Sequence, residues 1–124
     1  MPKTFHELCE ESKKNVKYCS VNEVKKMLED RENGKDNLLL FDIREDNEFD
    51  KGRIKGSLHL GKGIIERDIH HYTDDYNQKI ILYCGGGYRS VLAAESLQKM
   101  GYKNVISMDG GWKGWIEEKG ETEI

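Results

Sequence analysis

The chain has 124 residues, of which 36% are hydrophobic and 35% charged, and its formal net charge is −3. This length fits one domain with its own hydrophobic core, and the composition is typical of a globular protein. A net charge so close to zero argues against nucleic-acid partners that need a basic surface. No apolar run approaches the roughly 20 residues of a membrane span, and the first residues lack a signal-peptide core, so we expect a cytoplasmic protein without membrane partners.

The three cysteines, Cys9, Cys19 and Cys84, lie far apart and form no C-x-x-C pair. An odd number of cysteines without a secretion signal predicts free thiols, and the same spacing argues against a zinc site. We therefore expect no bound metal. Cys9 fits the apolar face of a short helix and Cys19 fits the core, which leaves Cys84 as the candidate for chemistry.

Helical and extended patterns alternate through the first half of the chain. Thr4 and Ser20 are plausible helix N-caps, and Glu23 completes a capping box with Ser20. The apolar run 37–43 has no polar alternation and is typical of a strand buried on both faces. In chain order we predict a helix from residue 5 that fades by 15, a strand over 16–19, a helix from 21 to the turn at 31–37, a strand over 37–43, a short helix and turn over 44–52, and a strand over 54–60.

The second half continues the alternation, with a helix over 63–72, a buried strand over 79–83, a helix over 89–100, a strand over 104–108 and a final helix after the turn 109–111. Strands that alternate with helices, and that are too apolar for a half-exposed sheet, predict an α/β fold. We expect a single domain with a five-stranded, mainly parallel sheet and helices on both faces, preceded by a helical extension over residues 1–15.

The segment CGGGYRS, residues 84–90, joins a buried strand to a helix. Ligands of parallel sheets bind at the carboxyl ends of the strands, where Cys84 lies. The N–H groups at the start of a helix are unpaired and favour an anion. Glycines tolerate positive φ and close approach, so the loop can turn its N–H groups inward. The sequence therefore predicts an anion-binding ring of backbone N–H groups with Cys84 at its base.

The magnitude of this effect decides whether the thiol is activated. A free cysteine is only a few per cent thiolate at neutral pH. A helix N-terminus contributes about 0.3–1 kcal/mol, which is less than the ~1.4 kcal/mol of one pKa unit. The loop N–H groups and the guanidinium of Arg89 must therefore add to it, and with them we expect Cys84 to be an anionic nucleophile. The alternative is a buried structural cysteine followed by a tight glycine turn.

The stretch YCGGGYRS, followed by VLAAESLQKMGYKNVISMDGGWKGW, resembles the rhodanese-like sulfurtransferase family. That family has an active-site Cys, a short loop with Gly and Arg, a Ser at the helix start and a later Gly-Gly-…-Trp segment. Upstream, LLLFDIRE and EFDKGRIKGSLHL resemble the family's Asp-Val-Arg and Gly-His-Ile-Pro-Gly-Ala segments. The resemblance covers roughly residues 16–119 and implies a single rhodanese-like domain over 16–120.

This resemblance implies a role for each residue of the loop. Cys84 would be the nucleophile that carries a persulfide, Arg89 would fold back on the loop, and Ser90 would cap the helix and fix the loop. The N–H groups that bind the substrate anion would come from the loop residues Gly85, Gly86, Gly87, Tyr88 and Arg89, and Ser90 would belong to the same anion-binding loop.

Outside the loop, the resemblance implies that Asp42 bonds to structure near the active-site loop. Arg44 would belong to the same support, with a solvated position as the alternative. The sequence departs from the family at Arg53 and Lys55, where His and Pro are usual. We expect these two changes to alter local contacts and to leave activity in place.

The function that follows is transfer of a sulfane sulfur, from a donor such as thiosulfate to cyanide, a thiol or a protein cysteine, without a metal or organic cofactor. Two alternatives remain open: a persulfide carrier that serves one protein partner, and a regulatory binding module. A cysteine phosphatase is a further alternative, because the cell-cycle phosphatases are similar in fold. Their loop is one residue longer than the four residues between Cys84 and Arg89, which favours sulfur over phosphate.

Overall fold

Capping boxes fix the starts of the first two long helices in the computed structural model, which describes residues 1–124. Helix α1 (Phe5–Lys13) begins after Thr4, whose side chain accepts the N–H of Glu7. Helix α2 (Val21–Glu32) begins after Ser20, and the predicted capping box with Glu23 is confirmed. In each box the Glu side chain also accepts the N–H of the cap residue, so two unpaired donors are satisfied.

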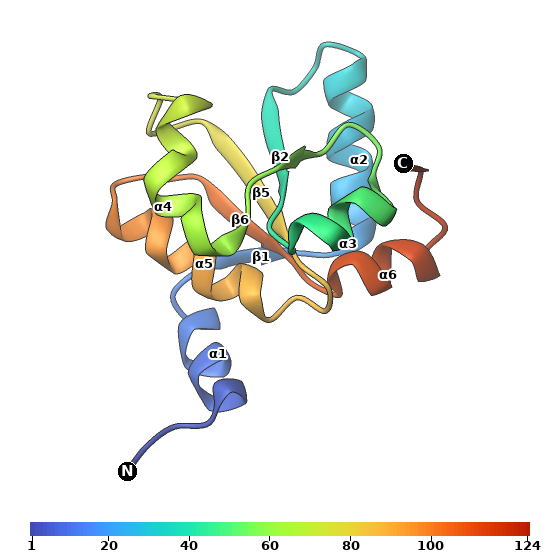
Figure 1. Ribbon diagram of the computed structural model, residues 1–124. Coiled ribbons are helices and arrows are strands. Elements are labelled where there is room, and N and C mark those ends of the chain that lie inside the picture. Colours follow the sequence, from blue (N-terminus) through green and yellow to red (C-terminus); the bar gives the residue numbers. More distant parts are fainter.

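Five strands form one sheet in the order β1-β6-β5-β2-β4, and every neighbouring pair is parallel. This confirms the predicted α/β fold with a five-stranded sheet. Strand β5, which leads to the candidate site, lies in the middle of the sheet between β6 and β2 (Figure 1). The strands are β1 (Lys17–Cys19), β2 (Leu38–Asp42), β4 (Leu58–His59), β5 (Lys79–Tyr83) and β6 (Val105–Met108).

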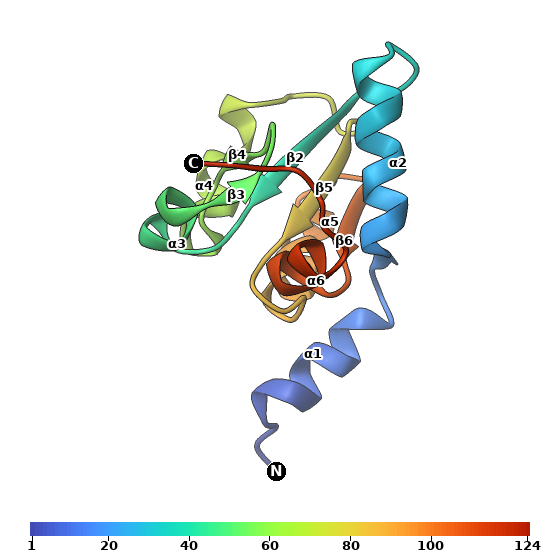
Figure 2. The same cartoon turned by 90° about the vertical axis from the view of Figure 1, so that its right-hand side faces the viewer.

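Helices cover both faces of the sheet, and alternate residues of β5 point to opposite faces. Ile80 and Leu82 pack into a core beneath α4 (Ile65–Asp68) and α5 (Arg89–Lys99). Ile81 and Tyr83 pack into a second core with residues of α2 and of α6 (Gly111–Glu117). Figure 2 shows α2 and α4 on opposite sides of the strands. Since both faces are buried, the strand has no polar alternation, as the sequence indicated.

The structure differs from the prediction of one strand over 54–60. The segment forms two short strands, β3 (Arg53–Ile54) and β4, and Gly56 turns between them with φ of 81°. Only β4 joins the main sheet. Strand β3 pairs antiparallel with β7 (Thr122–Glu123), and the N–H of Ile54 donates to the hydroxyl of Tyr83 at 3.1 Å. The backbone of β3 is therefore bonded to β7 and to the hydroxyl of Tyr83, and not to a strand of the main sheet.

The helix predicted over 63–72 is also interrupted. It consists of a 3₁₀ turn η1 (Lys62–Ile64), the short helix α4 and a second 3₁₀ turn η2 (Ile69–His71). Between β2 and β3 lies a short helix, α3 (Asp46–Lys51), in the region where one was predicted. None of the helices is both long and apolar enough to cross a membrane.

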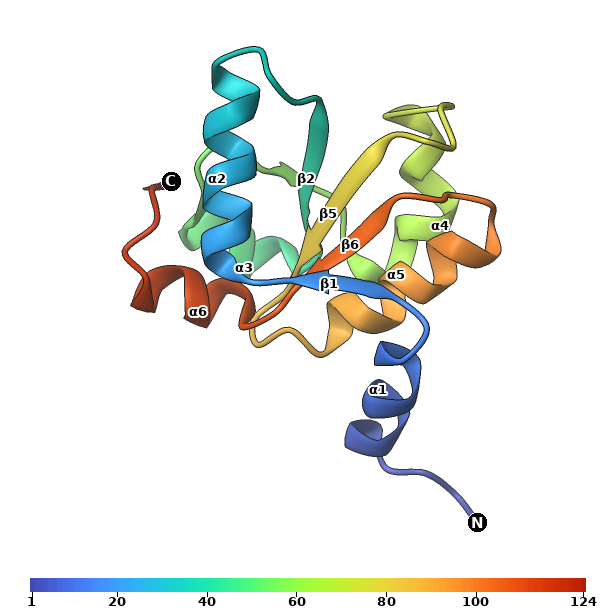
Figure 3. The same cartoon turned by 180° about the vertical axis from the view of Figure 1, so that it is seen from behind.

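Helix α1 lies outside the layers that cover the sheet and packs against α5 (Figure 3). Its buried residues, Cys9 and Ser12, face that contact, and Ser12 Oγ donates to Glu95 of α5 at 3.1 Å. Asn15 donates to the other carboxylate oxygen of Glu95 at 3.2 Å. Two hydrogen bonds to one carboxylate therefore fix the end of this segment on α5.

Candidate active site

Strand β5 carries the chain directly to Cys84, at the carboxyl edge of the sheet. The residue is 1% exposed and belongs to the core beneath α5. The preceding residue, Tyr83, accepts the N–H of Ile43 at 2.9 Å, which joins the ends of β5 and β2. Cys84 therefore directly follows a strand in the middle of the sheet.

The thiol of Cys84 makes two polar contacts. The N–H of Gly87 donates to Sγ at 3.1 Å, and the thiol donates to Ser90 Oγ at 3.7 Å. Gly87 adopts φ of 95°, and a Cβ there would lie 3.0 Å from the N of Gly110, so the turn requires glycine. The expected ring of loop N–H groups therefore amounts to one hydrogen bond to the thiol in this structure.

Ser90 fixes the far end of the loop. Its side chain is fully buried, donates to the carbonyl of Gly87 at 3.3 Å and lies 2.7 Å from Ser107 Oγ. Ser107 lies on β6 and is also fully buried. Ser107 was not among the residues predicted for the site, although a serine within an otherwise apolar strand is a signal for a buried polar contact.

The start of α6 holds the other side of the loop. The N–H of Trp112 donates to the carbonyl of Cys84 at 2.7 Å, and the N–H of Lys113 donates to that of Gly85 at 3.1 Å. The preceding Gly111 has φ of 55°, and a Cβ there would meet the carbonyl of Cys84 and lie 2.8 Å from that of Gly85. The glycines before Trp112 thus allow the close approach seen in Figure 1 between the β5–α5 loop and α6.

Arg89 is the first residue of α5, and its guanidinium lies over the beginning of the loop. Its Nη2 is 3.7 Å from the position of a Cβ on Gly85. The same atom is 3.9 Å from Oε1 of Glu48 on α3. Arg89 therefore does turn back toward the loop, but it also has an acidic partner that the sequence analysis did not identify.

Asp42 and Arg44 form a buried ion pair near the loop. Arg44 is 4% exposed, and its Nε and Nη2 donate to the carboxylate of Asp42, with a shortest distance of 2.7 Å. Burial by itself would lower the pKa of Arg44, but the hydrogen bonds and charge of Asp42 raise it. The solvated alternative for Arg44 is thus wrong.

The Arg44 guanidinium also reaches the helix that holds the loop. It lies 4.7 Å from the centre of the Trp112 ring and donates to the carbonyl of Gly52 at 2.6 Å. Because the N–H of Trp112 binds the carbonyl of Cys84, a continuous chain of contacts leads from Asp42 to the candidate nucleophile.

Tyr88 closes the loop on its outer side, against α1. Its carbonyl accepts a hydrogen bond from the Cys9 thiol at 3.5 Å, and its half-exposed ring lies 6.5 Å from that of Phe5. Burial and the nearby Cys84 raise the pKa of the Cys9 thiol, which keeps it protonated as a donor. A hollow of about 290 Å³ between α1 and the loop includes Cys9, Gly86, Gly87 and Tyr88 in its lining.

The two departures from the family pattern do not join this site. Arg53 lies 3.5 Å from Glu123, and Lys55 lies 3.3 Å from Glu121, so both positive charges are paired with acidic residues of the C-terminal segment.

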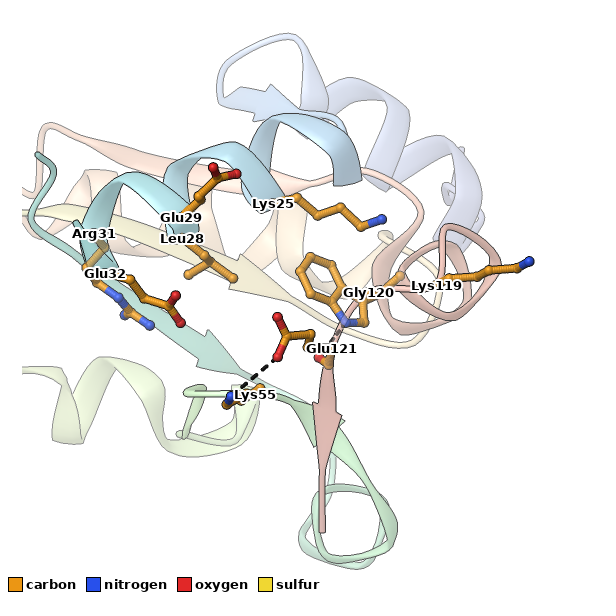
Figure 4. Close-up of a pocket in the computed structure, with 10 residues that line it drawn as sticks. Lys25, Leu28, Glu29, Arg31, Glu32, Lys55, Lys119, Gly120 and Glu121 are labelled. Atoms are coloured by element: carbon orange, nitrogen blue, oxygen red, sulfur yellow. Dashed lines mark hydrogen bonds and ion pairs between the residues drawn. The ribbon is translucent and has the colours of Figure 1, made fainter.

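A second groove, of about 360 Å³, lies between α2 and the C-terminal segment (Figure 4). Some of its charged groups are engaged within the chain: Lys55 pairs with Glu121, and Arg31 donates to the carbonyl of Leu38. None of the loop residues lines it. No three His, Cys, Asp or Glu side chains come together in an arrangement that could hold a metal ion.

Known proteins resemble this chain over most of its length. Residues 20–118 match the family described as "Rhodanese-like domain". A protein of Schizosaccharomyces pombe named "Putative thiosulfate sulfurtransferase, mitochondrial" is 30% identical over 116 residues, with 83% of this chain and 82% of that protein covered. The thiosulfate sulfurtransferase GlpE of Shewanella oneidensis is 30% identical, with 83% and 95% covered. The "Putative sulfur carrier protein YrkF" of Bacillus subtilis is 33% identical, with 71% and 45% covered.

Solved structures share the fold. A Rhodopseudomonas palustris protein of unknown function, described as a "Possible Tyrosine Phosphatase", superposes with a TM-score of 0.81 at 27% identity and covers 99% of both chains. A thiosulfate sulfurtransferase of Pseudomonas aeruginosa gives a TM-score of 0.78 at 21% identity, covering 91% of this chain and 21% of that one. The likeness to the first structure includes α1, because nearly the whole chain is covered.

Proposed function

Because this chain belongs to the family of rhodanese-like domains, we propose that it is a sulfurtransferase that carries sulfane sulfur as a persulfide on Cys84. The observation that carries the proposal is the position of the thiol. Cys84 directly follows the central strand of a parallel sheet, its thiol accepts the N–H of Gly87, and the loop after it leads into the N-terminus of α5. These features place a hydrogen-bond donor and the positive end of a helix near the sulfur that would carry the intermediate.

The first step loads the enzyme. The Cys84 thiolate attacks the outer sulfur of thiosulfate, the S–S bond of thiosulfate breaks, and sulfite leaves with the bonding electron pair. The product is the persulfide Cys84–S–S⁻. The N–H of Gly87, the start of α5 and the charge of Arg89 stabilise this anion, as preorganised donors stabilise an oxyanion.

The second step returns the enzyme to its starting state. A nucleophilic acceptor such as cyanide attacks the outer sulfur of the persulfide, and Cys84 leaves as a thiolate. With cyanide the product is thiocyanate. With a thiol acceptor the product is a new persulfide, so the same step serves a small molecule or a protein cysteine.

Asp42 and Arg44 act at a distance in this proposal. Arg44 stacks near Trp112, whose N–H holds the carbonyl of Cys84. The buried ion pair therefore fixes the direction in which the loop leaves β5. These two residues are positioning residues and do not contact the reacting sulfur.

Two relatives suggest different functions for the same thiol. The similarity to a protein named as a sulfur carrier favours the alternative in which the persulfide is passed to one partner protein. The Rhodopseudomonas palustris structure, described as a "Possible Tyrosine Phosphatase", raises the phosphatase alternative. Four residues separate Cys84 from Arg89, one fewer than a phosphatase loop needs, so sulfur remains the better fit.

A thiosulfate:cyanide assay on the wild type, Cys84→Ser and Cys19→Ser tests the proposal. Cys19 is a matched control because it is a buried cysteine in the opposite core. We expect Cys84→Ser to lose about a thousandfold or more in rate, because no other group can form the covalent intermediate, and Cys19→Ser to keep most of it.

Other outcomes would identify a different function. Turnover that persists in Cys84→Ser would refute the nucleophile. A wild type that forms a persulfide without turning over cyanide would be a carrier. Hydrolysis of p-nitrophenyl phosphate, without sulfur transfer, would make the protein a phosphatase.

A further inference from the structure

Glu48 faces the candidate active site from α3, a helix outside the loop. Its Oε1 lies 3.9 Å from Nη2 of Arg89, and the two side chains are 39% and 34% exposed. The same oxygen accepts the N–H of Glu45 at 3.1 Å, as part of the capping box of α3. The cap holds the carboxylate in one orientation, so its position toward Arg89 belongs to the fold of α3.

Arg89 has no other acidic partner in the structure, whereas the neighbouring Arg44 is fully engaged by Asp42. The charge of Glu48 also acts on Arg44, whose pKa it helps to raise. Glu48 is thus the ion-pair partner of Arg89, and its negative charge partly offsets the positive charge of the guanidinium. The edge of the loop is therefore less positive than the arginine alone would make it.

We infer that Glu48 is a specificity-determining residue that disfavours doubly charged sulfur donors relative to singly charged ones. This inference rests on the proposed function, in which the charge of Arg89 stabilises the persulfide anion; the same charge attracts the anionic donor to the loop. Thiosulfate carries two negative charges and must compete with Glu48 for the guanidinium. A donor with one charge loses less from that competition, because the repulsion from a fixed carboxylate scales with the donor's charge.

Methanethiosulfonate is the matched donor, because it presents the same outer sulfur on a sulfonyl group but carries one negative charge. The Cys84 thiolate attacks that sulfur, the S–S bond breaks and methanesulfinate leaves with the electron pair. The persulfide formed is the same as with thiosulfate. A difference between the two donors therefore reports on binding of the leaving portion and not on the enzyme intermediate.

Glu48→Gln removes the charge and keeps an amide oxygen that can accept the N–H of Glu45. Asp46→Asn is the matched control: it makes the same change of charge on the same helix, but Asp46 is 92% exposed and lies 3.4 Å from His59. Steady-state kcat and KM would be measured for both donors, with cyanide as the acceptor, in the wild type and both variants.

We expect Glu48→Gln to lower the KM for thiosulfate about two- to fivefold, the effect of a half-exposed ion pair, with little change in kcat. The KM for methanethiosulfonate should fall less, so the ratio of the two kcat/KM values should move toward thiosulfate. Asp46→Asn should leave that ratio unchanged.

The inference fails if Glu48→Gln leaves the ratio unchanged, or if Asp46→Asn moves it equally, since the latter would mean a general field effect of α3. A wild type that takes sulfur from neither donor would refute the proposed function itself. Transfer with an unchanged ratio would refute only the role of Glu48.

Discussion

Replacing Arg44 by methionine tests whether the buried ion pair supports the loop. Asp42 is fully buried, and Arg44 supplies its ionic partner through Nε and Nη2 at 2.7–3.1 Å. Methionine can fill much of the space but cannot pair with the carboxylate. The variant therefore leaves one charge in the interior without its partner, which is far more costly than removing both charges.

The expected loss can be set against the stability of a domain of this size. Breaking a buried pair by removing one partner costs about 3–5 kcal/mol, out of a total of about 5–15 kcal/mol. For a chain of this length the midpoint of thermal unfolding should fall by roughly 10–20 °C. Arg67→Met is the control, because Arg67 also pairs with a neighbouring carboxylate at 2.7 Å but is 73% exposed. Its unfolding midpoint should stay near that of the wild type.

Urea and thermal unfolding of Arg44→Met, Asp42→Asn and the double variant would measure this coupling. The double variant should be more stable than the sum of the single losses predicts, because it leaves no unpaired charge. A loss below about 1 kcal/mol in Arg44→Met, or strictly additive losses, would refute the reasoning.

Two further predictions concern packing at the loop and a core thiol. Gly111→Ala should lower the free energy of unfolding by about 1–3 kcal/mol and slow sulfur transfer tenfold or more, because its Cβ would push α6 away from the loop. Gly63→Ala is the control, because a Cβ there would meet open space. Equal behaviour of the two variants in urea unfolding and in activity would contradict the close contact between α6 and the loop. Burial raises the pKa of Cys19 from 9.0 to about 12. The folded state thus keeps a proton that the unfolded state releases. The contribution of Cys19 to the unfolding free energy should be fully present well below pH 9 and fall as the pH rises toward 12, by about 1.4 kcal/mol at pH 10. In Cys19→Ala the unfolding free energy should depend less on pH between about pH 8 and 10 than it does in the wild type. Equal slopes of the unfolding free energy against pH in the variant and the wild type would count against this.

Local patterns were sufficient to predict the central strand and the position of the thiol. The run KIILY gives β5 its observed bounds, Lys79–Tyr83, because a strand buried on both faces is continuously apolar. The glycines and Arg89 then indicate a loop and a helix start, where the structure has them. These features depend on neighbours in the sequence, which is why the sequence reveals them.

Contacts between distant segments could not be predicted in the same way. Glu48 and Arg89 meet only because α3 packs at the edge of the loop, and nothing in either segment alone indicates the other. The pairing of β3 with β7 was missed for a similar reason: both strands have two residues, they lie far apart in the sequence, and Thr122–Glu123 alone gives no strand pattern. Arg53, whose added charge the sequence could not place, is paired with Glu123 through that small sheet.

The central claim is that Cys84 carries the transferred sulfur, and mass spectrometry tests it most directly. The purified protein would be incubated with thiosulfate, its intact mass measured, and the modified residue located in a digest made without reductant. We predict the added mass of one sulfur atom on the peptide that contains Cys84, its removal by cyanide, and its absence from Cys84→Ser. An unchanged mass, or a sulfur found on Cys9 or Cys19 instead, would contradict the account.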